Sequence, residues 1–143
     1  MTKEDKELLL KDLCARLPYN VMVDYEGHIY MLNEIDPACK DIDYITVRIQ
    51  DEERLTCAKS VTIEKVKPYL RPMSSMTEEE KNIQKDYIYH FSGNSLPDYE
   101  GDFVFEDEVH EYIDWLNAHH FDYRGLIGKG LAMEAPEGTY NNN

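Results

Sequence analysis

The sequence predicts an α+β protein that consists of an N-terminal helix, a small antiparallel meander of four strands and a helical, acidic C-terminal half. Two changes of hydrophobic period predict this order of elements. Leucines recur at helical spacing near the N-terminus, and apolar residues then alternate with polar ones through four short segments. The helical period returns after residue 77, and most of the negative charge lies in that later part.

The length of 143 residues fits one domain with a core of its own. We therefore expect a single domain over residues 1–143, with the first helix and the meander in 1–76 and the helical half in 77–135. The polar residues 136–143 are expected to form a flexible tail.

A first helix is predicted over residues 3–17. Thr2 is a good N-cap, and the acidic residues after it suit the first turn, where the helix dipole favours negative charge. Leu9 and Leu13 fall on one helical face, and Pro18 ends the pattern.

Four strands are predicted next, over residues 21–25, 28–32, 44–49 and 57–63. Glu26-Gly27 is expected to form the tight turn of a hairpin between the first two strands. No connection has room for a crossover helix, so sequential strands are expected to pair antiparallel. The strand spacing also fits a small SH3-like barrel in residues 20–72.

A helical turn and then an extended connector are expected over residues 63–72, before the C-terminal half. Thr77 and Glu80 form a capping-box pattern, which opens a helix that ends near residue 90. A brief extended piece is expected at 103–105.

A further helix is predicted over residues 107–118, where apolar side chains return every three or four residues. They are Val109, Tyr112, Ile113 and Leu116. His119 and His120 fall in its last turn, where imidazoles can cap free carbonyls or lie at the surface. Asp122 is expected to cap a short final helix that ends near residue 131.

The net charge of −14 is concentrated in one part of the chain. Residues 1–76 carry a net charge of −3, and residues 77–143 carry −11. Ten carboxylates and no lysine or arginine lie between residues 86 and 122, and ten of the sixteen aromatic residues lie between 87 and 123. The carboxylates are those of Asp86, Asp98, Glu100, Asp102, Glu106, Asp107, Glu108, Glu111, Asp114 and Asp122.

This mixture predicts a surface that binds a basic partner protein. Direct contact with nucleic acid is not expected, because phosphate binding needs clustered lysine and arginine.

The sequence predicts a soluble, cytoplasmic protein without membrane contact. The first residues are charged and resemble no signal peptide, and no apolar stretch is long enough for a membrane span. Cys14, Cys39 and Cys57 are widely spaced, which favours reduced thiols over disulfides or a zinc site. Cys14 lies beside the leucines of the first helix and is expected to be a small buried residue.

No catalytic residue, metal or cofactor is predicted. The segment 98–102 resembles the start of a calcium loop, but Phe103 and Val109 stand where an EF-hand needs glycine and a bidentate glutamate. His119 and His120 are adjacent and would diverge by about 100° on a helix, so they are not expected to share a metal ion. The serines lack the setting of a catalytic nucleophile.

The predicted partner-binding residues all lie on the 107–118 helix, and they are Glu108, Glu111, Tyr112, Asp114 and Trp115. Trp115 lies off the apolar stripe, where it could anchor an interface or close a small core. Arg124 is the only basic residue between Lys85 and Lys129, and an ion pair with a neighbouring carboxylate is expected for it.

Two segments carry a resemblance to known proteins. Residues 114–127, Asp-Trp-Leu-Asn-Ala-His-His-Phe-Asp-Tyr-Arg-Gly-Leu-Ile, and the ending 130–138, Gly-Leu-Ala-Met-Glu-Ala-Pro-Glu-Gly, resemble small uncharacterised proteins encoded in prophages and mobile elements of gut bacteria. The connector 67–80 is similar to such proteins as well. The resemblance covers about a third of the chain and implies a context, a phage or mobile-element accessory protein, without a known activity.

Charge and context together predict a non-enzymatic accessory protein that docks its acidic half on a basic host protein, as a counter-defence factor or nucleic-acid-mimic inhibitor. A second hypothesis is an assembly protein that self-associates through Tyr112 and Trp115. A third is a small-molecule binder, such as a nucleotide binder, with a basic pocket supplied by the first half. The candidates for that pocket are Arg48, Arg54, Lys59, Lys65, Lys67 and Arg71.

Overall fold

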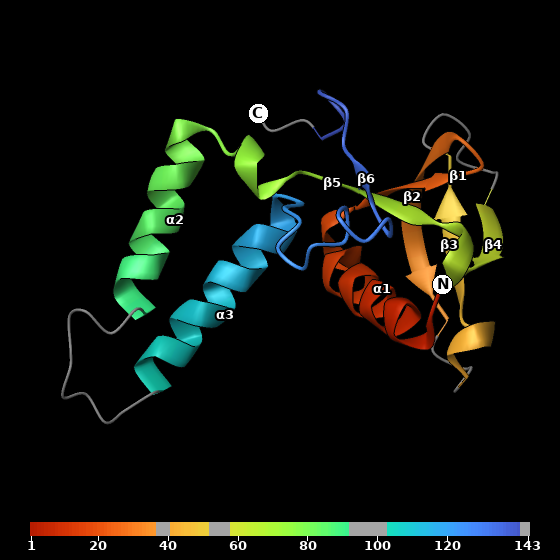
Figure 1. The fold of residues 1–143 in the computed structure, drawn as a ribbon, viewed down its shortest axis with the longest axis horizontal. Coiled ribbons are helices and arrows are strands. Elements are labelled where there is room, and N and C mark those ends of the chain that lie inside the picture. The colour runs from red at the N-terminus through yellow and green to blue at the C-terminus, as the bar shows by residue number, and fades with distance from the viewer. Residues whose placement is uncertain (37–40, 52–57, 92–102, 141–143) are drawn as a thin grey trace.

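The computed structural model describes residues 1–36, 41–51, 58–91 and 103–140, and it describes only the backbone of 89–91 and 103–108. The protein is α+β, with an N-terminal helix, a mixed six-stranded sheet and further helices (Figure 1). None of the helices in the described ranges is long and apolar enough to span a membrane.

The N-terminal helix α1 spans Lys3–Arg16, which confirms the predicted first helix. Thr2 and Asp5 form a capping box: the Thr2 hydroxyl accepts from the Asp5 backbone N–H at 3.1 Å, and the Asp5 carboxylate accepts from the Thr2 N–H at 3.3 Å. The helix ends in a single 3₁₀ turn, Leu17–Tyr19, which contains Pro18.

The sheet has the strand order β4-β3-β2-β1-β5-β6. All neighbours are antiparallel except β5 and β6, which are parallel. The strands are β1 Met22–Tyr25, β2 His28–Ile35, β3 Thr46–Gln50, β4 Ala58–Thr62, β5 Lys67–Leu70 and β6 Met133–Glu134. Single 3₁₀ turns lie at Ile42–Tyr44, Ile63–Lys65 and Met73–Ser75.

Glu26 and Gly27 connect β1 to β2 with positive φ angles of 51° and 83°. Two successive positive φ angles are typical of the two-residue hairpin turns whose twist matches that of the strands. The hairpin predicted at this dipeptide is therefore present.

The predicted sheet of four strands is too small. The expected connector over 63–72 contains β5, which pairs with β1 opposite Val23 and Asp24. Pro68 lies within this strand and has no backbone N–H to donate to a neighbouring strand, so the local sequence argues against a strand. The sixth strand comes from the far end of the chain and gives the sheet its one parallel pair.

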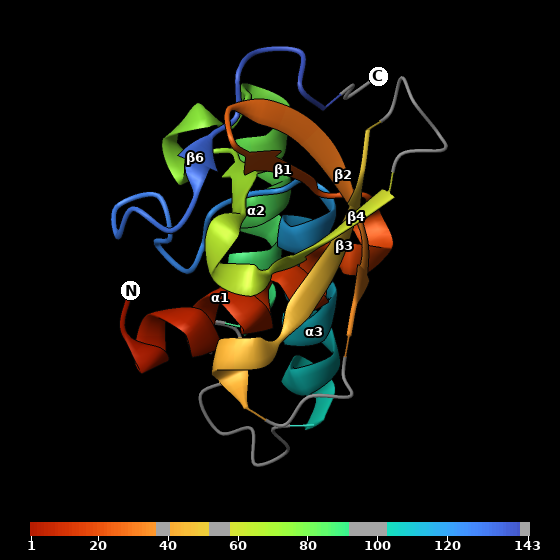
Figure 2. The ribbon, with the colours of Figure 1, turned by 90° about the vertical axis from the view of Figure 1, so that its right-hand side faces the viewer.

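Two helices, α2 Glu78–Phe91 and α3 Phe103–Ala118, pack against each other and extend away from the sheet (Figure 1). In Figure 2, which is viewed from the sheet end, they lie behind the strands. We call this pair the helical hairpin. The extended piece expected at 103–105 is wrong, because α3 already begins at Phe103. In Figure 1, α1 lies between the sheet and α3.

The short helix expected over 122–131 is absent, and turns occupy this segment. Gly125 and Gly130 have φ angles of 75° and 74°, which no α-helix contains. Asp122 still acts as a cap, since its carboxylate accepts from the backbone N–H groups of Leu126 and Ile127 at 2.8 and 2.9 Å.

Apolar side chains form two separate clusters. The larger one fills the space between α1 and the sheet, with Leu9, Leu13 and Ile49 fully buried, and it includes Leu126 from the C-terminal turns. The smaller one lies at the base of the helical hairpin around Leu116 and contains Met76 and Phe121. Cys14 is exposed on α1, so the expectation that it is buried is wrong. It faces away from the stripe formed by Leu9 and Leu13.

Candidate functional site

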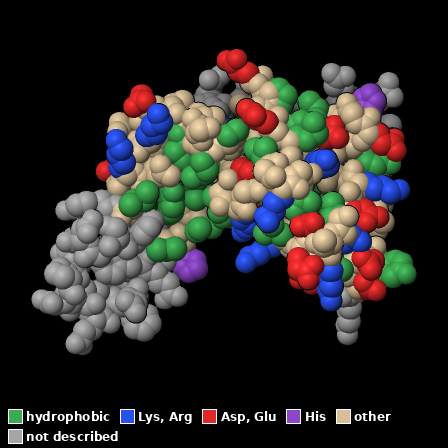
Figure 3. Space-filling view, in the orientation of Figure 1, with side chains coloured by type: hydrophobic (Ala, Val, Ile, Leu, Met, Phe, Trp, Pro, Cys, Tyr) green, Lys and Arg blue, Asp and Glu red, His purple; other side chains and the backbone are tan. Residues whose placement is uncertain are grey.

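The predicted partner-binding residues divide between two faces of α3. Glu111 and Asp114 are exposed, and no lysine or arginine among the described residues forms an ion pair with either. The Glu108 side chain lies outside the described part of the molecule. Figure 3 shows acidic and basic side chains intermixed over the sheet end of the molecule, and hydrophobic side chains gathered over the helical hairpin.

Tyr112 and Trp115 face α2 and the smaller core. Tyr87 of α2 lies 5.3 Å from Tyr112 and 6.2 Å from Trp115 between ring centroids, and the rings of Tyr112 and Trp115 are stacked at 6.2 Å. Trp115 also contacts Phe121 at 5.6 Å. Gln84 donates to the Tyr112 hydroxyl at 2.9 Å. These contacts hold α3 against α2, and Trp115 covers the smaller core.

Two histidines, His119 and His120, follow the end of α3 and make different contacts. The His119 ring lies with its Nδ1 2.9 Å from the carbonyl oxygen of Trp115, so it caps the helix end as predicted. His120 has a φ angle of 60° and is buried. Burial, with the positive charges of Arg16 and other neighbours, lowers the pKa of His120 to about 3, which keeps the imidazole neutral.

A buried ionic cluster ties α1 to the segment after α3. The fully buried Asp12 carboxylate accepts from Arg16 Nε at 2.9 Å and from Arg124 Nη1 at 2.8 Å. Arg16 is also fully buried and donates from Nη2 to the carbonyl oxygen of Phe121 at 2.5 Å. The ion pair expected for Arg124 is confirmed, with a partner that lies 112 positions away in the sequence.

Arg71 connects the sheet to the helical hairpin. Its guanidinium donates to both carboxylate oxygens of Glu80 at 2.8 Å and lies over the Phe121 ring, 4.3 Å from the centroid. Glu80 and Thr77 form the predicted capping box at the start of α2. The Arg71 guanidinium is the main reason that the pKa of Glu80 falls to about 2.

Three of the basic residues proposed for a nucleotide pocket, Arg48, Lys59 and Arg71, have separate surroundings. Arg71 is bound to Glu80, and Arg54 lies outside the described residues. Arg48 lines a shallow depression together with Glu34 and Asp36, whose carboxylates would repel a phosphate. Lys59 lies over the rings of Tyr25 and Tyr30 instead.

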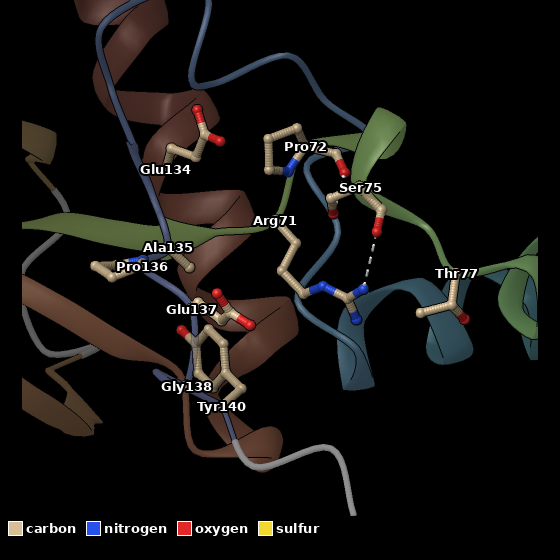
Figure 4. A pocket seen from close by; sticks show the side chains of 10 residues that line it. All are labelled: Arg71, Pro72, Ser75, Thr77, Glu134, Ala135, Pro136, Glu137, Gly138 and Tyr140. Atoms are coloured by element: carbon tan, nitrogen blue, oxygen red, sulfur yellow. Dashed lines mark hydrogen bonds between the residues drawn. The ribbon is translucent and has the colours of Figure 1, made fainter.

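A second pocket lies between β5, the start of α2 and the C-terminal residues (Figure 4). It has a volume of about 450 Å³. Arg71, Ser75 and Thr77 form one wall, and Glu134, Glu137 and Tyr140 belong to the opposite wall.

Within the described ranges, no group of three histidine, cysteine, aspartate or glutamate side chains could hold a metal ion. The calcium-loop candidate at 98–102 lies outside those ranges.

Several residues that organise this region were missed by the sequence analysis. Asp12 and Arg16 lie four residues apart on the same helical face as Leu9 and Leu13, so a buried ion pair could have been predicted from spacing. Tyr140 carries no local signal, because its hydrogen-bond partners are more than 70 residues away.

Comparisons of the chain with protein-family models, with curated proteins and with solved structures found no match.

Proposed function

We propose that this protein is a non-enzymatic accessory protein that binds a basic surface of a partner protein through the exposed acidic side of α3. One observation supports this most directly: Glu111 and Asp114 are exposed side chains without an ion-pair partner among the described residues. They lie on a helix whose neighbouring face is held against α2, where Tyr112 and Trp115 contact the ring of Tyr87.

Glu111 and Asp114 are three residues apart, so their side chains are neighbours on the helix surface, about 5–6 Å apart at Cβ. A basic partner would pair with these carboxylates without first breaking an ion pair to any residue that the structure describes. Because α3 is held by aromatic stacking, little ordering of the helix would oppose association. The net charge of −14 would also steer a basic partner and repel nucleic acid.

The proposed setting is the cytoplasm of a bacterial host, where the protein would be a counter-defence factor or a nucleic-acid-mimic inhibitor encoded by a phage or mobile element. The support is the resemblance of residues 114–127, 130–138 and 67–80 together with the acidic charge. A surface that normally holds nucleic acid is rich in lysine and arginine and is the natural complement of clustered carboxylates.

The finer architecture is part of the same proposal. In it, β1 to β4 form the antiparallel meander of a small SH3-like barrel that β5 closes by pairing with β1, and the helical hairpin is the acidic half attached to it. The strand order and the 3₁₀ turn between β4 and β5 support this arrangement.

A second candidate function is self-association through the helical hairpin. The observation that favours it is the exposure of two large apolar side chains on the hairpin, Ile88 at 43% and Val109 at 37%. Large apolar side chains that are exposed to water can be buried when two copies of the chain associate. Sedimentation of the purified protein over a wide concentration range separates the two functions, since this second one requires a dimer or larger species.

The proposed function is tested by affinity capture with matched charge variants. Glu111→Lys with Asp114→Lys reverses the charge of the α3 surface. Glu7→Lys with Glu26→Lys makes the same charge change at exposed positions of α1 and the β1–β2 turn. A true partner should be captured by the wild type and by the control variant and lost from the α3 variant. Equal capture by all three proteins would refute the role of α3.

A further inference from the structure

The C-terminal residues 133–140, which we call the strap, are bound to the sheet as a peptide ligand would be. Met133 and Glu134 of the strap pair in parallel with Tyr69 and Leu70 of β5. The ladder continues for one more bond, since the Ala135 N–H donates to the Leu70 carbonyl oxygen at 2.8 Å. Tyr140, which belongs to the tail predicted over residues 136–143, is hydrogen-bonded to the Tyr69 carbonyl oxygen.

Tyr140 fills a gap in the sheet. The pairing of β1 with β5 ends at Val23 opposite Pro68. Beyond this point the Tyr140 hydroxyl lies between the two strands, where it donates to the Tyr69 carbonyl oxygen at 2.6 Å and accepts from the Met22 N–H at 2.9 Å. A single phenol thus replaces the missing ladder bond.

The aromatic ring of Tyr140 also makes a specific contact. It stacks on the buried His120 ring with 3.7 Å between centroids and an interplanar angle of 14°. Burial raises the pKa of the Tyr140 phenol, so the hydroxyl keeps the proton that it donates. In Figure 4, Tyr140 lies on the strap side of the pocket, across from Ser75 and Thr77.

Proteins that bind a peptide as an added strand use backbone pairing at a sheet edge together with a pocket for a side chain, and the strap makes both kinds of contact. The backbone of the strap adds a strand to the sheet edge, and one side chain enters a specific site. The tyrosine site offers a donor, the Met22 N–H, an acceptor, the Tyr69 carbonyl, and an aromatic face, His120. Phenylalanine would leave the donor and the acceptor unpaired, so the site selects tyrosine.

We propose that this edge of the sheet is a binding site for an extended peptide that carries a tyrosine six residues after its second β-paired residue. In the structure the chain's own strap occupies this site. The strap of a second copy of the chain can replace it there. A second copy carries the matching backbone register and the matching tyrosine. The tethered strap has an effective concentration in the millimolar range, so it outcompetes a free copy until it is released.

The test uses a fluorescent synthetic peptide of residues 131–140 and the full-length chain with Tyr140→Ala, in which the tethered strap has lost its anchor. We expect the peptide to bind this variant at least tenfold more tightly than it binds the wild type. A peptide in which alanine replaces the tyrosine should lose at least tenfold in affinity for the variant. Equal, weak binding of both peptides to the variant would overturn the proposal.

A second variant covers the case in which Tyr140→Ala does not fold. Tyr140→Phe keeps the ring on His120 and removes only the hydroxyl that bonds Met22 and Tyr69. Amide hydrogen exchange at Ala135, whose N–H donates to the Leu70 carbonyl oxygen rather than to Tyr140, then reports release of the strap. We expect about tenfold faster exchange at Ala135 in this variant, with unchanged exchange in α1, because the strap loses the hydroxyl that binds it to both β1 and β5. Unchanged exchange at Ala135 would show that the strap is not released separately, and the proposal would fail.

Discussion

Replacement of Asp12 by alanine should cost this protein a large part of its stability. The Asp12 carboxylate is fully buried and pairs with Arg16 at 2.9 Å and with Arg124 at 2.8 Å. Arg16 is fully buried too, and its Nη1 already has no partner among the described residues. The substitution therefore leaves a buried guanidinium without its counter-charge, a loss that costs about 3–5 kcal/mol.

Urea unfolding measures this loss. With a slope of about 2 kcal/mol per molar urea, the midpoint should fall by about 2 M. Glu78→Ala is the matched control: it removes a carboxylate from an exposed pair with Lys81 and should change the stability by less than about 1 kcal/mol.

A double variant isolates the cause. Asp12→Leu with Arg16→Met replaces the buried pair with apolar side chains of similar size and should be much more stable than Asp12→Ala alone. If Asp12→Ala costs less than about 1 kcal/mol, or if the double variant is no better, the ionic cluster does not have the role assigned to it.

Three other predictions follow from the same region. His120 is held neutral in the folded state with a pKa of about 3, so the unfolded state takes up more protons and the stability should fall as the pH drops from about 6.5 towards 3. His120→Asn keeps a residue that tolerates the positive φ angle, and it should remove that slope between pH 6.5 and 4.5 in urea titrations; an unchanged slope would refute the assignment. Glu80 has a lowered pKa of about 2, so its pair with Arg71 should stabilise the fold above pH 4.5 and lose this effect as the pH falls towards 2. Glu80→Gln should cost about 1–3 kcal/mol at neutral pH, and a cost that persists at pH 2 would contradict the ionic explanation. Trp115→Ala should cost about 2–4 kcal/mol and speed amide exchange in α2 as well as α3, because this side chain stacks on both Tyr87 and Phe121; exchange that speeds in α3 alone would refute the bracing role.

The features predicted correctly from sequence are those encoded within a few residues. The N-cap at Thr2, the capping box of Thr77 with Glu80 and the turn at Glu26-Gly27 each depend on residues at most three positions apart. Such local geometry is set by backbone preference and by hydrogen bonds that the same segment supplies.

The features that were missed depend on distant segments. β5 is hard to foresee because Pro68 weakens its local strand signal, and its pairing with β1 joins residues about 45 positions apart. β6 is only two residues long and becomes a strand because Leu70 and Tyr69 provide an open edge. Tyr140 and the pairing of Asp12 with Arg124 arise from the same long-range packing.

The candidate surface was predicted in part. Helical spacing places Glu111 and Asp114 on one side of α3, and the structure exposes both. The same spacing did not decide whether Trp115 anchors an interface or covers a small core. Its contacts with Tyr87 and Phe121 come from α2 and from the turn after α3, which periodicity along α3 alone does not reveal.

The central claim, that the acidic side of α3 binds a basic partner, is tested most directly by quantitative affinity capture from a bacterial host lysate. The wild type, the Glu111→Lys/Asp114→Lys variant and the Glu7→Lys/Glu26→Lys control are compared at about 0.15 M and about 1 M salt, where the screening length falls from about 8 Å to about 3 Å. The account predicts a basic protein that is enriched on the wild type and the control at low salt. The same protein should be reduced about tenfold on the α3 variant and at high salt. A partner that is retained equally by all three baits, or equally at both salt concentrations, would contradict it.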